Sequence, residues 1–98
     1  MMKVEQMINS RGNGAMNQFV ITDEGRIVFQ SYSSTIADVD YTTHTIKIGT
    51  HWDYSNTTGK HRNIFFDSYV NLPGLATKAG LLKAINAGEY EGWKIEMM

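Results

Sequence analysis

The chain has 98 residues, of which 42% are hydrophobic, with one proline and no cysteine. This length fits one small domain with a single hydrophobic core, and the lack of cysteine excludes a disulfide framework, a cysteine-ligated zinc site and a thiol nucleophile. Nine Lys and Arg residues oppose ten Asp and Glu residues, and the net charge of −1 excludes both a strongly basic nucleic-acid binder and a strongly acidic mimic of DNA.

The N-terminal part of the chain has a weak pattern. Residues 1–15 are expected to be a flexible segment or a first strand, with a loop of turn residues at 9–14, and residues 16–98 a single α+β domain. Residues 1–10 carry charges where a secretory signal would be apolar. No apolar stretch approaches the ~18 residues of a membrane span. We therefore expect a cytoplasmic protein that does not contact a membrane.

Strands are predicted for the next part of the chain. Residues 16–22 alternate apolar and polar side chains with a period of two, residues 23–25 form a turn that ends in glycine, and residues 26–32 are rich in β-forming types. This pattern predicts a β-hairpin. Residues 35–41 and 43–49 are the next two strands, and the short connections favour antiparallel pairing throughout.

The second half of the chain predicts two helices. The first spans about residues 58–70, follows a cluster of hydroxyl and amide side chains that could cap it, and ends before Pro73. The second begins after Thr77 and ends at Gly88. Its apolar stripe is Leu81, Leu82 and Ile85.

A last strand is predicted near the C-terminus, where Tyr90, Trp93 and Ile95 alternate with charged residues. The expected fold is therefore α+β: an antiparallel sheet of four to five strands with two helices packed on one face.

No motif for catalysis or for metal binding is present in the sequence. His44, His51 and His61 lie seven and ten residues apart, which matches no compact ligand spacing. No nucleophile elbow, P-loop or dinucleotide fingerprint occurs, and Gly12-Asn13-Gly14 lacks the strand and helix that would give a Gly-x-Gly meaning. We therefore assign no catalytic residue, no metal ligand and no cofactor.

Two segments combine aromatic and polar side chains in a way typical of a binding surface. Residues 29–32 end a strand with a tyrosine, and residues 51–62 run from aromatics into a predicted helix N-terminus with nearby bases, an arrangement that can hold an anion. Aromatic and Arg side chains dominate binding hot spots. The candidate binding residues are Tyr32, Trp52, Tyr54, Lys60, His61 and Arg62.

Each candidate also has a structural interpretation. In so small a domain Trp52 and Tyr54 are more often core or core-edge aromatics than ligand-stacking groups. Asp53 and residues 55–58 are more often helix caps than catalytic groups. The bases at 60–62 could simply be a solvated helix face.

The same segments resemble those of a known group of proteins. The patterns are FQSYxSxIA at residues 29–37, preceded by Asn17-Gln18-Phe19, and WDYSxTTxKH at residues 52–61. Together they resemble a family of short proteins of unknown function encoded by bacteriophages and mobile elements. Residues 77–90 resemble that family's C-terminal helix, which ends in Gly-Glu-Tyr, whereas residues 71–76 are longer than the expected connection. The resemblance implies a genomic setting and no particular chemistry.

The leading hypothesis is a small non-enzymatic phage or mobile-element protein that binds a host protein in the bacterial cytoplasm, for example as an inhibitor or modulator. The alternative is a nucleic-acid binder, in which bases stack on exposed tyrosines while Lys47, Lys60 and Arg62 contact phosphates. A third hypothesis, an enzyme acting through His61 and Asp53, requires the two side chains to meet in one cleft.

Overall fold

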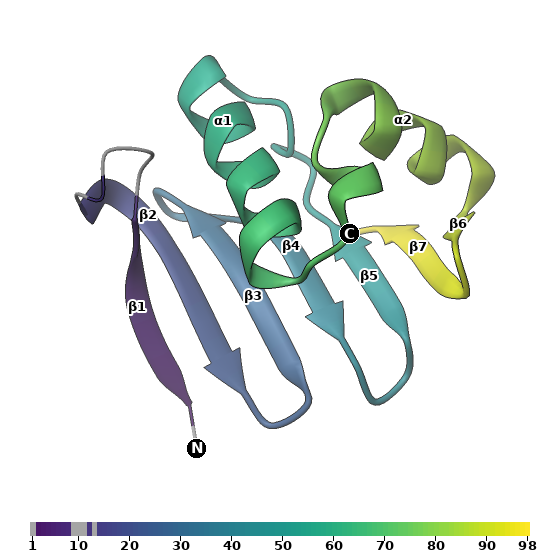
Figure 1. Ribbon diagram of the computed structural model, residues 1–98, viewed down its shortest axis with the longest axis horizontal. Coiled ribbons are helices and arrows are strands. Elements are labelled where there is room, and N and C mark those ends of the chain that lie inside the picture. Colours follow the sequence, from purple (N-terminus) through teal and green to yellow (C-terminus); the bar gives the residue numbers. More distant parts are fainter. Residues whose placement is uncertain (1, 9–11, 13) are drawn as a thin grey trace.

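The computed structural model describes residues 2–8, 12 and 14–98, and these form a mixed sheet with helices on one side (Figure 1). Within these residues the sheet has seven strands in the order β1-β2-β3-β4-β5-β7-β6. They are β1 (Lys3–Ile8), β2 (Gly14–Asp23), β3 (Arg26–Ser31), β4 (Ser34–Asp40), β5 (Thr45–Ile48), β6 (Glu89–Tyr90) and β7 (Trp93–Met97). The α+β class is confirmed. The sheet exceeds the expected four to five strands because β1 joins it and the C-terminal segment supplies two strands.

Strands β1 to β5 form an antiparallel meander, as their short connections predict. The predicted hairpin is β2–β3, in which Val20 lies opposite Phe29 and the turn residue Gly25 has a φ of +68°. Glycine suits this turn because a Cβ penalises the left-handed region. The loop expected at residues 9–14 falls mostly outside the described residues.

Strand β7 corrects the prediction of a wholly antiparallel sheet. It runs parallel to β5, with Ile46 opposite Ile95, and it pairs with β6 on its other side. A parallel pair needs a long crossover connection, and residues 49–92, with both helices, supply it. Strands β1 to β5 thus pair antiparallel through short connections, whereas β7 reaches its place beside β5 through a long crossover.

The first predicted helix is present with a change of geometry along its length. Helix α1 (Asn56–Ile64) begins after the capping residue Ser55 and continues as a π-helical segment, η1 (Phe65–Tyr69). The amide of Val70 donates to the carbonyl of Phe65 at 3.1 Å, an i to i−5 hydrogen bond. The helical region therefore starts two residues earlier than predicted, because Ser55 and not a later residue caps it.

The second predicted helix is α2 (Lys78–Ala87), and both of its predicted ends are confirmed. Thr77 caps the first turn, and Gly88 follows the last residue at a φ of 73°. Leu81 is buried, but Leu82 is 42% exposed, so the predicted apolar stripe is narrower than expected. Figure 1 shows α1 over the middle of the sheet and α2 near the β6–β7 end, so face packing matches the expectation in part.

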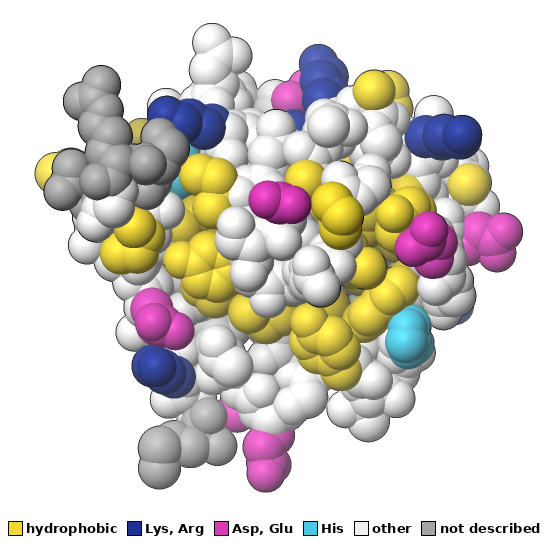
Figure 2. Space-filling model, in the orientation of Figure 1, with side chains coloured by type: hydrophobic (Ala, Val, Ile, Leu, Met, Phe, Trp, Pro, Cys, Tyr) yellow, Lys and Arg dark blue, Asp and Glu magenta, His cyan; other side chains and the backbone are white. Residues whose placement is uncertain are grey.

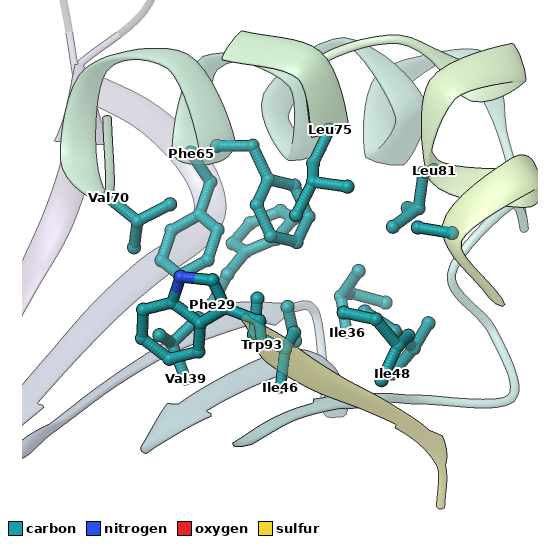
Figure 3. Packing of buried hydrophobic residues seen from close by; sticks show 14 of the residues in the cluster. Phe29, Ile36, Val39, Ile46, Ile48, Phe65, Val70, Leu75, Leu81 and Trp93 are labelled. Carbon is teal, nitrogen blue, oxygen red and sulfur yellow. The ribbon is translucent and has the colours of Figure 1, made fainter. Parts of the chain in front are cut away.

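The core lies between the sheet and the helical segments. Phe29 of β3 stacks on Phe65 of η1, with ring centroids 5.6 Å apart. Figure 3 shows Leu75, from the short 3-10 helix η2 (Pro73–Leu75), and Leu81 pointing from the helical layer toward the side chains of the sheet. Burial of such apolar surface supplies most of the driving force for folding.

The other side of the sheet carries the alternate residues of each strand. Val20 and Phe29 point into the core, so their strand neighbours point to this side, which is free of helices within the described residues. We call it the open face. Its apolar half comprises Val4, Phe19, Ile21 and Val28; its charged half includes Arg26, Asp38, Asp40, Lys47 and Glu96.

Candidate functional site

A pocket of about 490 Å³ lies between the β3–β4 turn and the start of α1. Its volume falls in the range of small-ligand and side-chain pockets. Hydroxyl groups predominate in its lining. The lining residues are Ser31, Tyr32, Ser33, Ser34, Ile36, His51, Tyr54, Ser55 and Thr58. We call this feature the hydroxyl pocket.

The β3–β4 turn forms one wall of the hydroxyl pocket. Ser31 lies opposite Ser34, so Tyr32 and Ser33 are the two turn residues. Tyr32 has a φ of 56°, and its amide donates to the carbonyl of Asn17 at 2.7 Å. The Tyr32 side chain is 55% exposed. A large aromatic therefore projects into solvent from a backbone position that favours glycine.

The start of α1 forms the opposite wall. Ser55 caps the helix by accepting a hydrogen bond from the amide of Thr58 at 3.1 Å. Its hydroxyl also lies 3.2 Å from the hydroxyl of Thr58, which in turn lies 3.0 Å from the hydroxyl of Ser31. Hydrogen bonds between these three hydroxyls join the end of β3 to the first turn of α1 and fix the width of the hydroxyl pocket.

The segment between β5 and α1 completes the rim. The rings of His51 and Tyr54 are tilted against each other with centroids 5.7 Å apart, and the amide of Tyr54 donates to the carbonyl of His51 at 3.1 Å. Tyr54 is 69% exposed. The structure thus brings together two of the six predicted binding residues, Tyr32 and Tyr54, at one opening.

Trp52 and Arg62 lie together, Trp52 partly buried and Arg62 fully buried. Arg62 is 2% exposed, and its Nη1 donates to the carbonyl of Trp52 at 2.8 Å. The guanidinium lies over the Trp52 ring, 5.2 Å from its centroid, a cation–π contact. Trp52 packs against the core cluster. Trp52 therefore lies at the edge of the core, in agreement with its structural interpretation.

Of the three basic residues at 60–62, two are buried and one is exposed. Arg62 is buried, and His61 is 6% exposed, with Nδ1 at 2.8 Å from the carbonyl of Thr57 and Nε2 buried without a hydrogen-bond partner in the described chain. Lys60 is exposed. Successive residues of a helix point in different directions, so one basic side chain faces solvent while the other two face the interior. Their binding roles stay predictions.

Asp53 connects the loop to both helices. Its carboxylate lies 2.8 Å from Lys78 Nζ and 3.5 Å from Arg62 Nη1. The hydrogen bond from Lys78, with a smaller contribution from Arg62, holds the pKa of Asp53 below its ordinary value. Asp53 thus pairs with two cations, while His61 bonds to the backbone carbonyl of Thr57. The two side chains required by the enzyme hypothesis, His61 and Asp53, are not hydrogen-bonded to each other.

Sequence reasoning missed several residues of the hydroxyl pocket. Ser33, Ser34 and His51 line it but were not predicted as binding residues. For Ser34 a signal was present, since FQSYxSxIA places Ser31 and Ser34 on either side of the β3–β4 turn. The sequence could not show that this turn lies close to the helix N-terminus in space, because the two are more than twenty residues apart in the chain.

Across residues 2–8, 12 and 14–98, no three His, Asp or Glu side chains gather closely enough to hold a metal ion. Within the same residues no helix has the length and apolar character needed to cross a membrane.

Comparison with known proteins gives one result. The model of a family of unknown function (DUF8033) matches residues 2–78. The match includes both segments of the hydroxyl pocket and ends at the first residue of α2. The family's description gives neither an origin nor an activity. No curated protein and no solved structure matches the chain.

Proposed function

Since the chain belongs to DUF8033, a family of unknown function, we propose a function from the site itself: the protein binds a partner protein at the hydroxyl pocket, with Tyr32 and Tyr54 as anchors. The observation that carries this proposal is the pair of exposed tyrosines at the opening of one pocket. Tyrosine is enriched in protein interfaces because it combines a large apolar ring with a hydrogen-bonding tip.

The backbone at Tyr32 strengthens the proposal. A non-glycine residue at a φ of 56° costs about 1 kcal/mol or more, and the exposed side chain of Tyr32 recovers little of this by burial. Strained positions of this kind cluster at functional sites. A tyrosine there is consistent with selection for binding in spite of a cost in stability.

The chemistry of the pocket suggests what it would accept. Its hydroxyls can both donate and accept hydrogen bonds, and the amide end of α1 adds a weak positive potential. A polar side chain of the partner, inserted between Tyr32 and Tyr54, would exchange hydrogen bonds with Ser33 and Ser34. The apolar contribution would come from the two tyrosine rings.

The proposed setting follows from the resemblance to phage and mobile-element proteins. We propose that the partner is a protein of a bacterial host and that binding takes place in the host cytoplasm. In this setting the protein would inhibit or modulate its partner through surface contact.

Nucleic-acid binding is the alternative, and electrostatics argue against it. Of the three bases assigned to phosphates, Arg62 is buried, Lys47 lies on the open face, and Lys60 is exposed on α1. Figure 2 shows Lys and Arg side chains scattered around the margin of the visible face instead of gathered in a patch. Phosphate contacts supply most of the affinity for nucleic acid, so two exposed lysines on opposite sides of the sheet are a weak basis for it.

The test uses a photo-crosslinking amino acid placed at Ser33, inside the pocket, or at Lys83, on the exposed side of α2, in a bacterial lysate. We expect a partner protein to be captured from position 33 and not from position 83. The purified partner is then titrated against variants. Tyr32→Gly combined with Tyr54→Ser should weaken binding by about tenfold or more, whereas Leu82→Ser, which removes an exposed apolar side chain elsewhere, should not.

Two results would overturn the proposal. One is a partner whose affinity is unchanged by the double tyrosine variant. The other is binding of single-stranded nucleic acid at about 50 mM salt that falls steeply by about 200 mM and is lost with the same variant, because that outcome would make the tyrosines a base-stacking platform.

A further inference from the structure

Strand β1 forms one edge of the sheet, and within the described residues no strand pairs with its outer side. An open edge is a template for pairing with another chain. We propose that two copies of this protein associate through β1, antiparallel, about a two-fold axis that passes beside Val4 normal to the sheet. This surface is separate from the hydroxyl pocket, since Lys3 lies opposite Thr22, at the other end of the sheet from Ser31.

The charges of β1 complement each other in this arrangement. Glu5 lies opposite the buried Val20, so Glu5 and Lys3 share the helix-bearing side of the sheet, where their charged groups are 3.7 Å apart. Both side chains are largely exposed. In an antiparallel pair centred on Val4, Lys3 of each copy lies directly opposite Glu5 of the other. Opposite charges directly across a ladder stabilise it, and the two-fold axis supplies the contact twice.

The neighbouring registers lack this complementarity. A two-fold pair must be centred on one residue for both copies to keep their helices on the same side. Centring on Lys3 puts lysine against lysine, and centring on Glu5 puts glutamate against glutamate. Like charges directly opposite are destabilising, so the charge pattern selects the register centred on Val4.

The shape of β1 favours the same register. Its pairing with β2 is regular from Lys3 to Gln6 and then shifts at a bulge before Ile8. Bulges bend a strand and interrupt pairing. The register centred on Val4 pairs Lys3 to Glu5 within the regular part of the strand, with Met2 opposite Gln6 at either end, whereas a register centred on Glu5 would extend into the bulge.

Pairing through β1 would also extend the apolar half of the open face. Val4 is 58% exposed and adjoins Ile21 on β2. In the dimer the two Val4 side chains become neighbours, and the apolar halves of the two open faces join into one surface. Five residues of each copy form the ladder, so the contact is smaller than a standard interface of ~800 Å² per partner and the association should depend on concentration.

The test is sedimentation equilibrium of the whole chain between about 10 μM and about 1 mM, where small interfaces associate. The wild type should shift from monomer to dimer over this range. Lys3→Glu alone and Glu5→Lys alone each replace two attractive contacts with two repulsive ones, so each should weaken dimerisation by about tenfold or more. The double variant Lys3→Glu/Glu5→Lys restores opposite charges and should dimerise like the wild type.

A mixture gives the decisive measurement. Equal amounts of Lys3→Glu and Glu5→Lys should form a heterodimer, although neither variant pairs well with itself, because every cross-strand contact in the mixture joins opposite charges. An unchanged urea midpoint for each variant shows that folding is intact. A wild type that stays monomeric up to about 1 mM, single variants that dimerise like the wild type, or a mixture that stays monomeric would each overturn the proposal.

Discussion

The guanidinium of Arg62 lies over the indole of Trp52 and donates a hydrogen bond to the same residue's backbone carbonyl at 2.8 Å. This double contact ties α1 to the segment that precedes it, and with it the edge of the hydroxyl pocket. Burial lowers the pKa of Arg62 and the Asp53 carboxylate opposes that change, yet an arginine stays charged in proteins. Arg62 therefore has a structural role, although its position in the sequence is typical of an exposed cation.

Replacing Arg62 tests that role. Arg62→Met should lower the free energy of unfolding by about 2–3 kcal/mol, because it leaves the Trp52 carbonyl without this donor and removes a cation–π contact. Lys60→Met, at an exposed position of the same helix, should change it by less than about 0.5 kcal/mol. Urea unfolding followed by fluorescence measures both. Equal effects would show that Arg62 contributes no more than a surface side chain.

The helical glycines should respond in opposite ways to alanine. A Cβ at Gly80 of α2 would lie 2.1 Å from the carbonyl oxygen of Gly74, whereas one at Gly59 of α1 would lie 3.6 Å from its nearest neighbour, Arg62. Gly80→Ala should therefore destabilise the protein by about 1–3 kcal/mol through overpacking. Gly59→Ala should stabilise it by about 0.5–1 kcal/mol through helix propensity. Thermal unfolding measures the midpoint temperature of each variant. If both midpoints shifted in the same direction, this account would be contradicted.

The ion pairs of Asp53 should make stability depend on pH. The hydrogen bond from Lys78 lowers the folded-state pKa of this carboxyl below 3.8, so the paired carboxylate stabilises the fold above that pH and the contribution is lost as pH falls through the folded pKa. Asp53→Asn should be less stable than the wild type at about pH 7, and the difference should shrink toward about pH 3.

Urea unfolding at several pH values measures the difference for Asp53→Asn. Asp67→Asn, at an exposed position of η1, controls for the loss of one negative charge. A difference between wild type and Asp53→Asn that stays constant as the pH falls would contradict the contribution of the ion pairs.

Tyr32 should show a conflict between stability and binding. Its φ of 56° predicts that Tyr32→Gly raises the free energy of unfolding by about 0.5–1 kcal/mol, while it removes an anchor of the proposed interface. His44 has the same φ, but its ring lies 3.8 Å, centroid to centroid, from that of Trp93. His44→Gly should therefore increase the free energy of unfolding by less than Tyr32→Gly does, or decrease it. A Tyr32→Gly variant less stable than the wild type would make the tyrosine a structural residue.

Much of the local structure could be predicted from the sequence. The alternation in residues 16–22, the glycine of the 23–25 turn and the cap pair of Thr77 and Gly88 each specify a conformation through neighbours close in the chain. Such signals work because the backbone and its nearest side chains decide them. They predicted the β2–β3 hairpin and both ends of α2.

The candidate site was predicted in part for the same reason. Tyr32 and Tyr54 could be identified as aromatics in polar surroundings, but Arg62 could not be told from Lys60, since a buried arginine and an exposed lysine look alike in a sequence. The burial of Arg62 depends on Trp52 and Asp53, which reach it through a turn.

By itself the sequence determined an α+β protein, its β2–β3 hairpin and the ends of α2, because short-range sterics and capping hydrogen bonds fix these. The tertiary structure alone decided the rest. It placed β7 parallel to β5, it brought the Ser31 and Thr58 hydroxyls within 3.0 Å, and it left β1 as an edge with alternating charges. A protein of low net charge thus contains a buried cation, a pocket of neutral hydroxyls and a self-complementary strand. Packing between residues far apart in the sequence decides which of its charges are exposed to solvent.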